Sequence, residues 1–171
     1  DLASQAATGT VGSTERASIQ LEFSALRQEL TRIANTTEFN GIGLIDGSLA
    51  SSVASTSHTL IQIGIDNTAN SRLDLNNTLA LDAVTAEKLG LNVLSVSASA
   101  EALTALASIE TAIASVTASR GKVGAIQNRL QRSVSSLSIS TENLQAAESA
   151  IRDADIAHEI AERSEERRVG K

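Results

Sequence analysis

A seven-residue repeat of apolar side chains runs through the second half of the chain and limits what the chain can fold into. Its members follow one another without interruption: Ala102, Ile109, Val116, Val123, Leu130, Leu137, Leu144 and Ile151. A second set accompanies them: Leu106, Ile113, Ile126, Val134, Ala147 and Ala154. A repeat of this kind predicts a coiled-coil helix with a left-handed supercoil. If residues 99–160 form one helix, it is about 90 Å long and needs partner helices to bury its apolar seam.

Two glycines, Gly121 and Gly124, interrupt this segment, although each costs about 1 kcal/mol relative to alanine inside a helix. They could mark a bend in the helix or a place where another backbone approaches closely. Because the apolar seam keeps its phase across both glycines, we expect a close approach.

The N-terminal part of the chain carries a second helical pattern. Its apolar residues recur at spacings of four, three, four and three: Ile19, Phe23, Leu26, Leu30 and Ile33. This spacing predicts a helix with one apolar seam, which we expect to be core. Ser13 is the expected N-cap, and Glu15 lies in the first turn, where the helix dipole favours a negative charge. Phe39, just beyond the pattern, is expected to pack against the seam.

The middle of the chain, residues 36–98, is rich in Ser, Thr, Asn and Gly and has no helical period over most of its length. Asn40-Gly41 and Asp46-Gly47 are strong turn signals. Isoleucines alternate along residues 60–66, which predicts a strand, and residues 72–81 are a candidate partner strand across a hairpin loop.

The rest of the middle segment predicts little regular structure. A short helix ending at Gly90 is expected within residues 82–91, and the low-complexity residues 48–57 are expected to form a surface loop. The fold class that follows is mainly α: an elongated antiparallel coiled-coil or helical-bundle rod with a small β-hairpin region.

Composition narrows the function classes. The chain has 171 residues, with no Pro, Cys, Met, Trp or Tyr and only two Phe, and its formal net charge is −6. The acidic balance and the lack of an aromatic platform argue against nucleic acid as a partner. No uninterrupted apolar run approaches the roughly 18 residues that span a bilayer, so membrane insertion is not expected. The chain opens in mid-pattern without Met, and we interpret it as a fragment.

An acidic stretch near the C-terminus resembles a reactive centre at first sight. Its candidate ligands are Asp153, Asp155, His158, Glu159 and Glu162. A zinc protease needs a second His four residues after the first, and Glu162 occupies that position. The spacings of Glu148 with Arg152 and of Glu159 with Arg163 predict ordinary pairing on a solvated helix. No catalytic, cofactor-binding or metal-ligating residue is therefore expected.

The apolar stripe also changes face in this stretch. The repeat runs to Ile151, the next position in phase is His158, and the apolar residues move to Ile156 and Ile160. A helix that changes its buried face near residues 152–155 is expected to change partners there.

Two long motifs resemble the conserved regions of bacterial flagellins. "LASQAATGT" followed by "ERASIQLEFSALRQELTRIANTTEFNGIGLIDGS" resembles the amino-terminal region, and "LIQIGID" the strand that follows it. "SRGKVGAIQNRLQRSVSSLSISTENLQAAESAIRDADIAHE" resembles the carboxy-terminal region. The resemblance implies the rod-like domain called D1, with most of the terminal D0 helices missing.

By this resemblance the chain divides into four parts. Residues 1–35 are the amino-terminal D1 helices, residues 36–98 the β-hairpin and loop region with a minimal variable segment, and residues 99–162 the long carboxy-terminal helix reaching the D0 junction. Residues 163–171, "RSEERRVGK", depart from the family pattern, and we interpret them as an atypical tail.

The resemblance implies a structural subunit of the flagellar filament that self-assembles for swimming motility, outside the cell. Its implied partners are other flagellin subunits, the flagellar export machinery with a chaperone, and the innate immune Toll-like receptor 5. The receptor-binding positions that it implies are Leu2, Glu22, Arg120, Val123, Ile126, Gln127 and Arg129. The expected subunit-packing positions are Asn128, Asn143, Arg152, Asp153 and Asp155.

Three other functions remain open at this point. A hook–filament junction protein shares the plan of the terminal helices. A carboxylate metal-binding enzyme would be centred on residues 153–162. A coiled-coil adaptor would use the same seven-residue repeat without polymerising.

Overall fold

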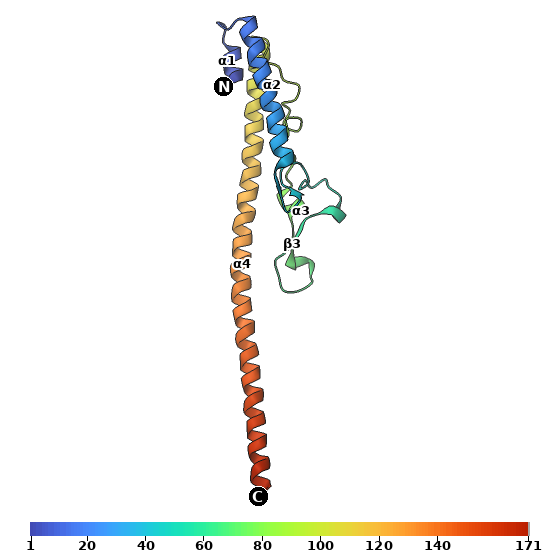
Figure 1. Cartoon of the computed structure of the whole chain (residues 1–171), viewed down its shortest axis with the longest axis vertical. Coiled ribbons are helices and arrows are strands. Elements are labelled where there is room, and N and C mark those ends of the chain that lie inside the picture. The colour runs from blue at the N-terminus through green and yellow to red at the C-terminus, as the bar shows by residue number, and fades with distance from the viewer. Residues whose placement is uncertain (171) are drawn as a thin grey trace.

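One helix dominates the architecture of the computed structural model, which describes residues 1–170, except for the side chains of Glu162, Glu166, Arg167 and Val169. This helix, α4, spans Ser99–Val169. Its 71 residues make it about 105 Å long at roughly 1.5 Å per residue. The long continuous helix predicted from the seven-residue repeat is confirmed, and helical backbone continues into the segment 163–169 (Figure 1).

Two further helices pack beside the N-terminal third of α4. The short α1 spans Leu2–Ala7, and α2 spans Ser13–Thr36. Alanines make the contact between α1 and α4 close, since Ala3, Ala6, Ala102 and Ala105 are all buried in one cluster with Ile19, Phe23 and Val96. Arg16 joins α1 to α2 by donating from Nε to the carbonyl oxygen of Ala6 over 2.9 Å.

The direction of the helices differs in one detail from the predicted rod. The mainly helical rod with a small β region is confirmed, and the short α1 runs opposite to α2 and α4. The two long helices, however, run in the same direction (Figure 1). Ile19 and Phe23 of α2 share a cluster with Ala102 and Ala105 of α4, and Leu30 packs further along with Ile109 and Ala112.

The antiparallel partner of α2 is an irregular segment, residues 84–98, that returns along it. Arg27 of α2 donates to the carbonyl oxygens of Leu91, Asn92 and Leu94, and its guanidinium lies 5.4 Å from the centre of the Phe23 ring. Gln20 accepts from the amide of Val96 over 2.7 Å. These contacts allow a segment with little regular structure to pack on the rod.

The α2 seam is buried only in part. Ile19 and Phe23 are core, but Leu26 is 56% exposed and Ile33 is 45% exposed, so the prediction that the whole seam is core was wrong. Phe39, expected to pack against this seam, is 74% exposed. Ser13 is the first residue of α2 rather than its cap, because Gly12 occupies the N-cap position.

Two hairpins form the β region. β1 (Glu38–Phe39) pairs with β2 (Ile42–Gly43) across the turn at Asn40 and Gly41, which have positive φ of 53° and 75°. This geometry is the reason for the Asn-Gly pair. β3 (Leu60–Gln62) pairs with β4 (Arg72–Asp74), with Ile61 opposite Leu73. The sequence predicted the second hairpin, and for the first it predicted the turn at Asn40-Gly41 but not the two short strands.

The second hairpin is shorter than predicted. β3 ends at Gln62 because the amides of Ile63 and Gly64 both donate to the carbonyl oxygen of Ser71, which breaks the ladder. A Cβ on Gly64 would lie 3.1 Å from the Cα of Ser71. β4 ends at Asp74, and the residues predicted to extend it form helix α3, Leu75–Leu79, because Asp74 caps the amide of Asn77.

Two other predictions for the middle need correction. Residues 85–90 form turns rather than a helix, although Gly90 has the positive φ of 71° expected where a helix ends. Two 3₁₀ turns occur, at Ser55–Ser57 (η1) and Ala69–Ser71 (η2). Residues 48–57 are not simply a surface loop, because Leu49 is buried with Leu73, Leu79, Leu81 and Ile126.

The glycines of α4 are not places of close approach within this chain. A Cβ added to Gly121 or Gly124 would have no neighbouring atom within 4 Å among the described residues. The expected close approach was therefore wrong for contacts within residues 1–170.

Candidate assembly surface

The apolar repeat of α4 meets two different environments. Near its start Ala102 is buried, and Ile126 and Leu130 pack in the cluster that includes Leu49 and Leu73. The C-terminal part of α4 extends past the other described elements (Figure 1), and the buried clusters of the described residues include no α4 residue beyond Leu130. The seven-residue repeat continues in this part, so its apolar side chains keep the coiled-coil spacing but belong to none of the buried clusters among residues 1–170.

We name four of these residues the distal stripe: Val134, Leu137, Leu144 and Ile151. A period of 3.6 residues places them on one face of α4. Val134, Leu144 and Ile151 are 65%, 56% and 66% exposed, whereas Leu137 is half-buried. Ile156 and Ile160, also exposed, lie on another face, as the predicted change of face requires. An exposed stripe of this length is typical of a surface that another helix covers.

Charged pairs cover part of the remaining helix surface. Arg152 donates to Glu148, and Nε of Arg163 donates to Oε1 of Glu159 over 3.0 Å. Both pairs have the spacing predicted from the sequence. Because their side chains are 61–76% exposed, solvent screens them and each contributes only about 0.5 kcal/mol.

The predicted subunit-packing residues all lie on exposed positions of α4. They are Asn128, Asn143, Arg152, Asp153 and Asp155. Asn128 lies between Ile126 and Leu130, which belong to the buried cluster around Leu49 and Leu73, and the other four lie further along the helix. They are accessible to a neighbour, and Arg152 is already paired with Glu148.

The acidic stretch does not build a metal centre. Asp153, Asp155, His158 and Glu159 are exposed along one helix, and the side chain of Glu162 lies outside the described set. Within the described part of the chain, no group of three or more His, Asp or Glu side chains could hold a metal ion. The described side chains of residues 153–162 therefore do not supply the ligand set that a carboxylate metal-binding enzyme would need.

The predicted receptor positions fall into two groups. Leu2 packs against the α1–α2–α4 cluster, and Glu22 is exposed beside it on α2. The remaining positions, residues 120–129, lie roughly 25 Å further along α4 at about 1.5 Å per residue. Arg120, Gln127 and Arg129 are exposed, Val123 is half-buried and Ile126 is 9% exposed.

A groove runs beside the second of these groups. It has a volume of about 430 Å³, with an apolar lining from Ile45, Leu81, Val84, Val116 and Val123. Asp82, Arg120 and Gln127 supply polar groups at the same groove. The loop residues 81–84 therefore place apolar surface beside the face of α4 that carries Arg120 and Gln127.

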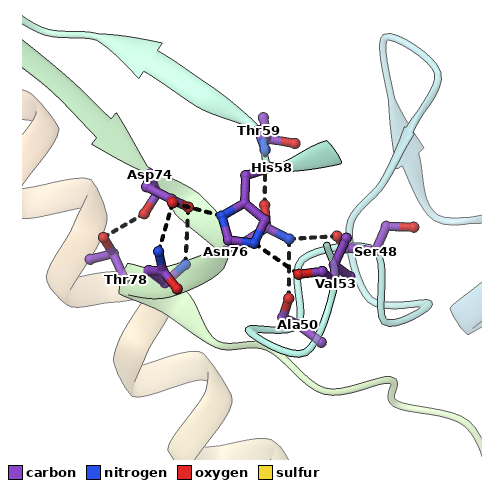
Figure 2. Close-up of polar contacts among 9 residues, drawn as sticks. Ser48, Ala50, Val53, His58, Thr59, Asp74, Asn76 and Thr78 are labelled. Atoms are coloured by element: carbon purple, nitrogen blue, oxygen red, sulfur yellow. Dashed lines mark hydrogen bonds and ion pairs between the residues drawn. The ribbon is translucent and has the colours of Figure 1, made fainter. Parts of the chain in front are cut away.

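A buried polar cluster lies under the 48–59 loop (Figure 2). An isolated His is the one feature of the sequence that points to it. Asn76 is fully buried. Its Nδ2 donates to the carbonyl oxygens of Ser48 and Ala50 over 2.8 and 3.1 Å, and its Oδ1 accepts from the amide of Thr59 over 2.9 Å. His58 contacts Asp74 and the carbonyl of Val53 in the same cluster.

One finding differs from the expectation about membranes. A window within Ser99–Glu165 of α4 is long and apolar enough, by length and composition, to cross a bilayer. The segment mixes apolar residues with Ser and Thr, so a search for uninterrupted apolar runs does not detect it. A single helix of this kind is weak evidence for a membrane span, because the core helix of a soluble protein passes the same test.

Comparisons with known proteins agree with this geometry. The family model for the bacterial flagellin N-terminal helical region matches residues 1–50, and the model for the bacterial flagellin C-terminal helical region matches residues 106–168. The second match includes residues 163–168 of the segment interpreted as an atypical tail. Together the two matches cover α1, α2, the first hairpin and most of α4.

Individual relatives are named as flagellins or as flagellar filament core proteins. The protein named "Putative flagellin YvzB" of Bacillus subtilis (strain 168) is 42% identical over 140 residues, covering 81% of this chain and 80% of that protein. The "Flagellar filament 30.7 kDa core protein" of Treponema maltophilum is 34% identical over 170 residues, covering 95% of this chain and 58% of that protein. The chain thus spans only 58% of the length of several relatives that it matches.

A solved structure supports the fold. The crystal structure of Bacillus cereus flagellin matches with a TM-score of 0.58 and 28% sequence identity, over 78% of this chain and 70% of that one. With both terminal family regions present in order, the chain belongs to the bacterial flagellin family, a family of structural proteins rather than enzymes.

Proposed function

We propose that this chain supplies the rod-like part of a flagellar filament subunit, and that the subunit polymerises with copies of itself to serve swimming motility. The observation that carries the proposal is the distal stripe, where the seven-residue repeat continues beyond the chain's own core. Apolar residues at coiled-coil spacing need a helical partner, which a longer subunit or a neighbouring subunit supplies. A repeated contact between unlike surfaces that does not close generates a filament.

The relatives favour a filament subunit over a hook–filament junction protein or an adaptor, because they are named as flagellins and filament core proteins. Under this proposal Asn128, Asn143, Arg152, Asp153 and Asp155 contribute polar contacts around the apolar stripe.

Electron microscopy of the full-length parent protein after salt-induced polymerisation tests the proposal. We expect helical filaments from the parent, and soluble protein from residues 1–171 alone. Leu144→Asn with Ile151→Asn in the parent should abolish filaments, whereas Ser135→Asn, on the far side of α4, should not. A parent that never forms filaments, or filaments that form equally well without the distal stripe, would contradict the proposal.

Export and location follow from the same proposal. The subunit leaves the cell through the flagellar export machinery, with a chaperone, and resides in the extracellular filament. Deleting the export apparatus in the source bacterium should keep the parent protein inside the cell. Unchanged release into the medium would contradict this route.

The proposal includes recognition by Toll-like receptor 5 through Leu2, Glu22, Arg120, Val123, Ile126, Gln127 and Arg129. The exposed Arg120, Gln127 and Arg129 beside the groove on α4 support direct contact, whereas the buried Ile126 supports a role in shaping the surface. A cell reporter assay with the parent protein should give a response that Arg120→Ala lowers. No response at high dose would overturn the receptor proposal while leaving the filament proposal intact.

A further inference from the structure

His58 holds two segments together through both nitrogens of its ring (Figure 2). Nδ1 lies 2.7 Å from Oδ2 of Asp74, and Nε2 lies 3.0 Å from the carbonyl oxygen of Val53. An ionised carboxylate and a carbonyl can only accept hydrogen bonds. Both contacts are therefore hydrogen bonds at the same time only when the ring carries two protons and a positive charge.

The two partners of the ring belong to different parts of the fold. Val53 lies in the 48–59 loop. Asp74 ends β4 and caps α3, where its Oδ1 accepts from the amide of Asn77 over 3.1 Å. Leu79 at the end of α3 packs with Ile126 of α4. The His58 side chain, only 5% exposed, thus connects the loop to the helical rod.

Other charged side chains on the surrounding elements have partners of their own. Arg72 on β4 donates to Asn67, Lys122 on α4 donates to the carbonyl of Ala80 over 3.0 Å, and Asp46 accepts from the amide of Ser48 over 2.8 Å. Among the described residues, Asp74 is the charged group that contacts the ring.

The charge states follow from this pairing. The hydrogen bond to Asp74 raises the pKa of His58 above its ordinary 6.5, and the same bond lowers the pKa of Asp74 below its ordinary 3.8. The His58 contribution to stability is complete below the ordinary histidine pKa and is lost as pH rises through the raised value. The Asp74 contribution is complete above the ordinary aspartate pKa and is lost as pH falls through the lowered value. The pair is therefore most stabilising between pH 3.8 and 6.5.

We propose that His58 is a proton-operated latch: the doubly protonated ring holds the 48–59 loop against β4 and α3, and loss of one ring proton opens the middle of that loop. The bond to Asp74 is charge-assisted and therefore persists, so the bond that breaks is the one from Nε2 to Val53. Asn76 keeps Ser48, Ala50 and Thr59 in place, which confines the opening to residues 51–57. The latch does not depend on the filament role.

Limited proteolysis of the 171-residue chain tests the latch. A non-specific protease is applied at about pH 6 and about pH 9, on either side of the ordinary histidine pKa, and its rate on an unstructured peptide corrects for its own pH dependence. We expect cleavage within residues 51–57 to increase about fivefold at the higher pH. Loss of one hydrogen bond, at about 1 kcal/mol, raises the population of the open loop by about that factor. His58→Gln should remove this pH dependence, and His158→Gln, which changes the other histidine, should retain it.

Nitrogen NMR of the wild-type chain measures the protonation state of the two ring nitrogens of His58 directly. It does not depend on a variant that folds. We expect both ring nitrogens to be protonated at about pH 6, and Nε2 to lose its proton as pH rises. A neutral ring at that pH would overturn the latch. So would cleavage of residues 51–57 that is independent of pH, or the same pH dependence in His58→Gln.

Discussion

At the scale of the residue, Asn76 joins three backbone segments with one side chain. The side-chain amide donates hydrogen bonds to the carbonyl oxygens of Ser48 and Ala50 and accepts one from the backbone amide of Thr59. The side chain is fully buried. An amide can donate and accept at once, which no apolar residue of similar size can do. Asn76 therefore fixes where the 48–59 loop begins and ends against β4 and α3.

We predict that Asn76→Ala lowers the free energy of unfolding of the 171-residue chain by about 2–4 kcal/mol. The reason is the loss of three hydrogen bonds, at about 1 kcal/mol each, and the burial of partners left without one. Urea denaturation followed by circular dichroism measures the change. Asn128→Ala, on an exposed position of α4, is the control and should change it by no more than about 0.5 kcal/mol. Equal effects of the two substitutions would contradict the role of Asn76.

At the scale of the element, α4 carries one repeat through two environments. Ile126 is 9% exposed and packs with Leu49, Leu73 and Leu81, whereas Ile151 is 66% exposed. The repeat predicts the helix and its apolar face, but it does not predict which turns of that face this chain covers.

The same substitution at these two positions should have different effects on stability. Ile126→Ala should lower the free energy of unfolding by about 2–5 kcal/mol, because it removes buried methyl groups and leaves a cavity. Ile151→Ala should change it by less than about 0.5 kcal/mol, because alanine is a better helix former and little burial is lost. The measurement is the same urea titration. A large loss for Ile151→Ala would show that the distal stripe is covered in solution, for example by a second copy.

A substitution at one of the glycines of α4 should raise the free energy of unfolding rather than lower it. Gly121→Ala should raise the free energy of unfolding by about 0.5–1 kcal/mol, because a Cβ there meets no atom within 4 Å and alanine favours the helix. Thermal unfolding of the chain measures the gain. A loss of stability would mean that another backbone approaches Gly121 in solution, as the sequence pattern had suggested.

At the scale of the whole molecule, packing is concentrated at one end of the rod. Among the described residues, the three clusters of buried side chains use α4 only as far as Leu130, whereas the helix continues to Val169. An isolated helix in water has little stability of its own, because most helical stability in proteins comes from packing. The distal part of α4 should therefore open more readily than the proximal part.

Amide hydrogen exchange of the 171-residue chain checks this expectation. Amides in residues 140–160 should exchange at least about tenfold faster than those in residues 102–126, since local opening there requires no loss of core contacts. In the polymerised parent protein the difference should disappear, because a partner helix covers the distal stripe. Equal protection in the isolated chain would contradict the assignment of the distal stripe as an uncovered surface.

The sequence predicted most of the helical architecture because helix formation depends on local spacing and propensity. It failed at Phe39, Leu26 and Ile33, which are apolar but exposed. A local pattern shows that a side chain could be buried, but burial also needs a neighbour. The β3–β4 hairpin was predicted from alternation, but its short length follows from the contact of Gly64 with Ser71.

The amino-acid sequence was enough to specify the long helix of the seven-residue repeat, the turn at Asn40 and Gly41, and the family to which the chain belongs. Each depends on residues close together in the sequence or on motifs in order. The tertiary structure alone decided that α2 and α4 run parallel, that the repeat loses its cover after Leu130, and that His58 meets Asp74. Those features depend on residues far apart in the chain, and spacing along a sequence does not encode which distant surfaces meet.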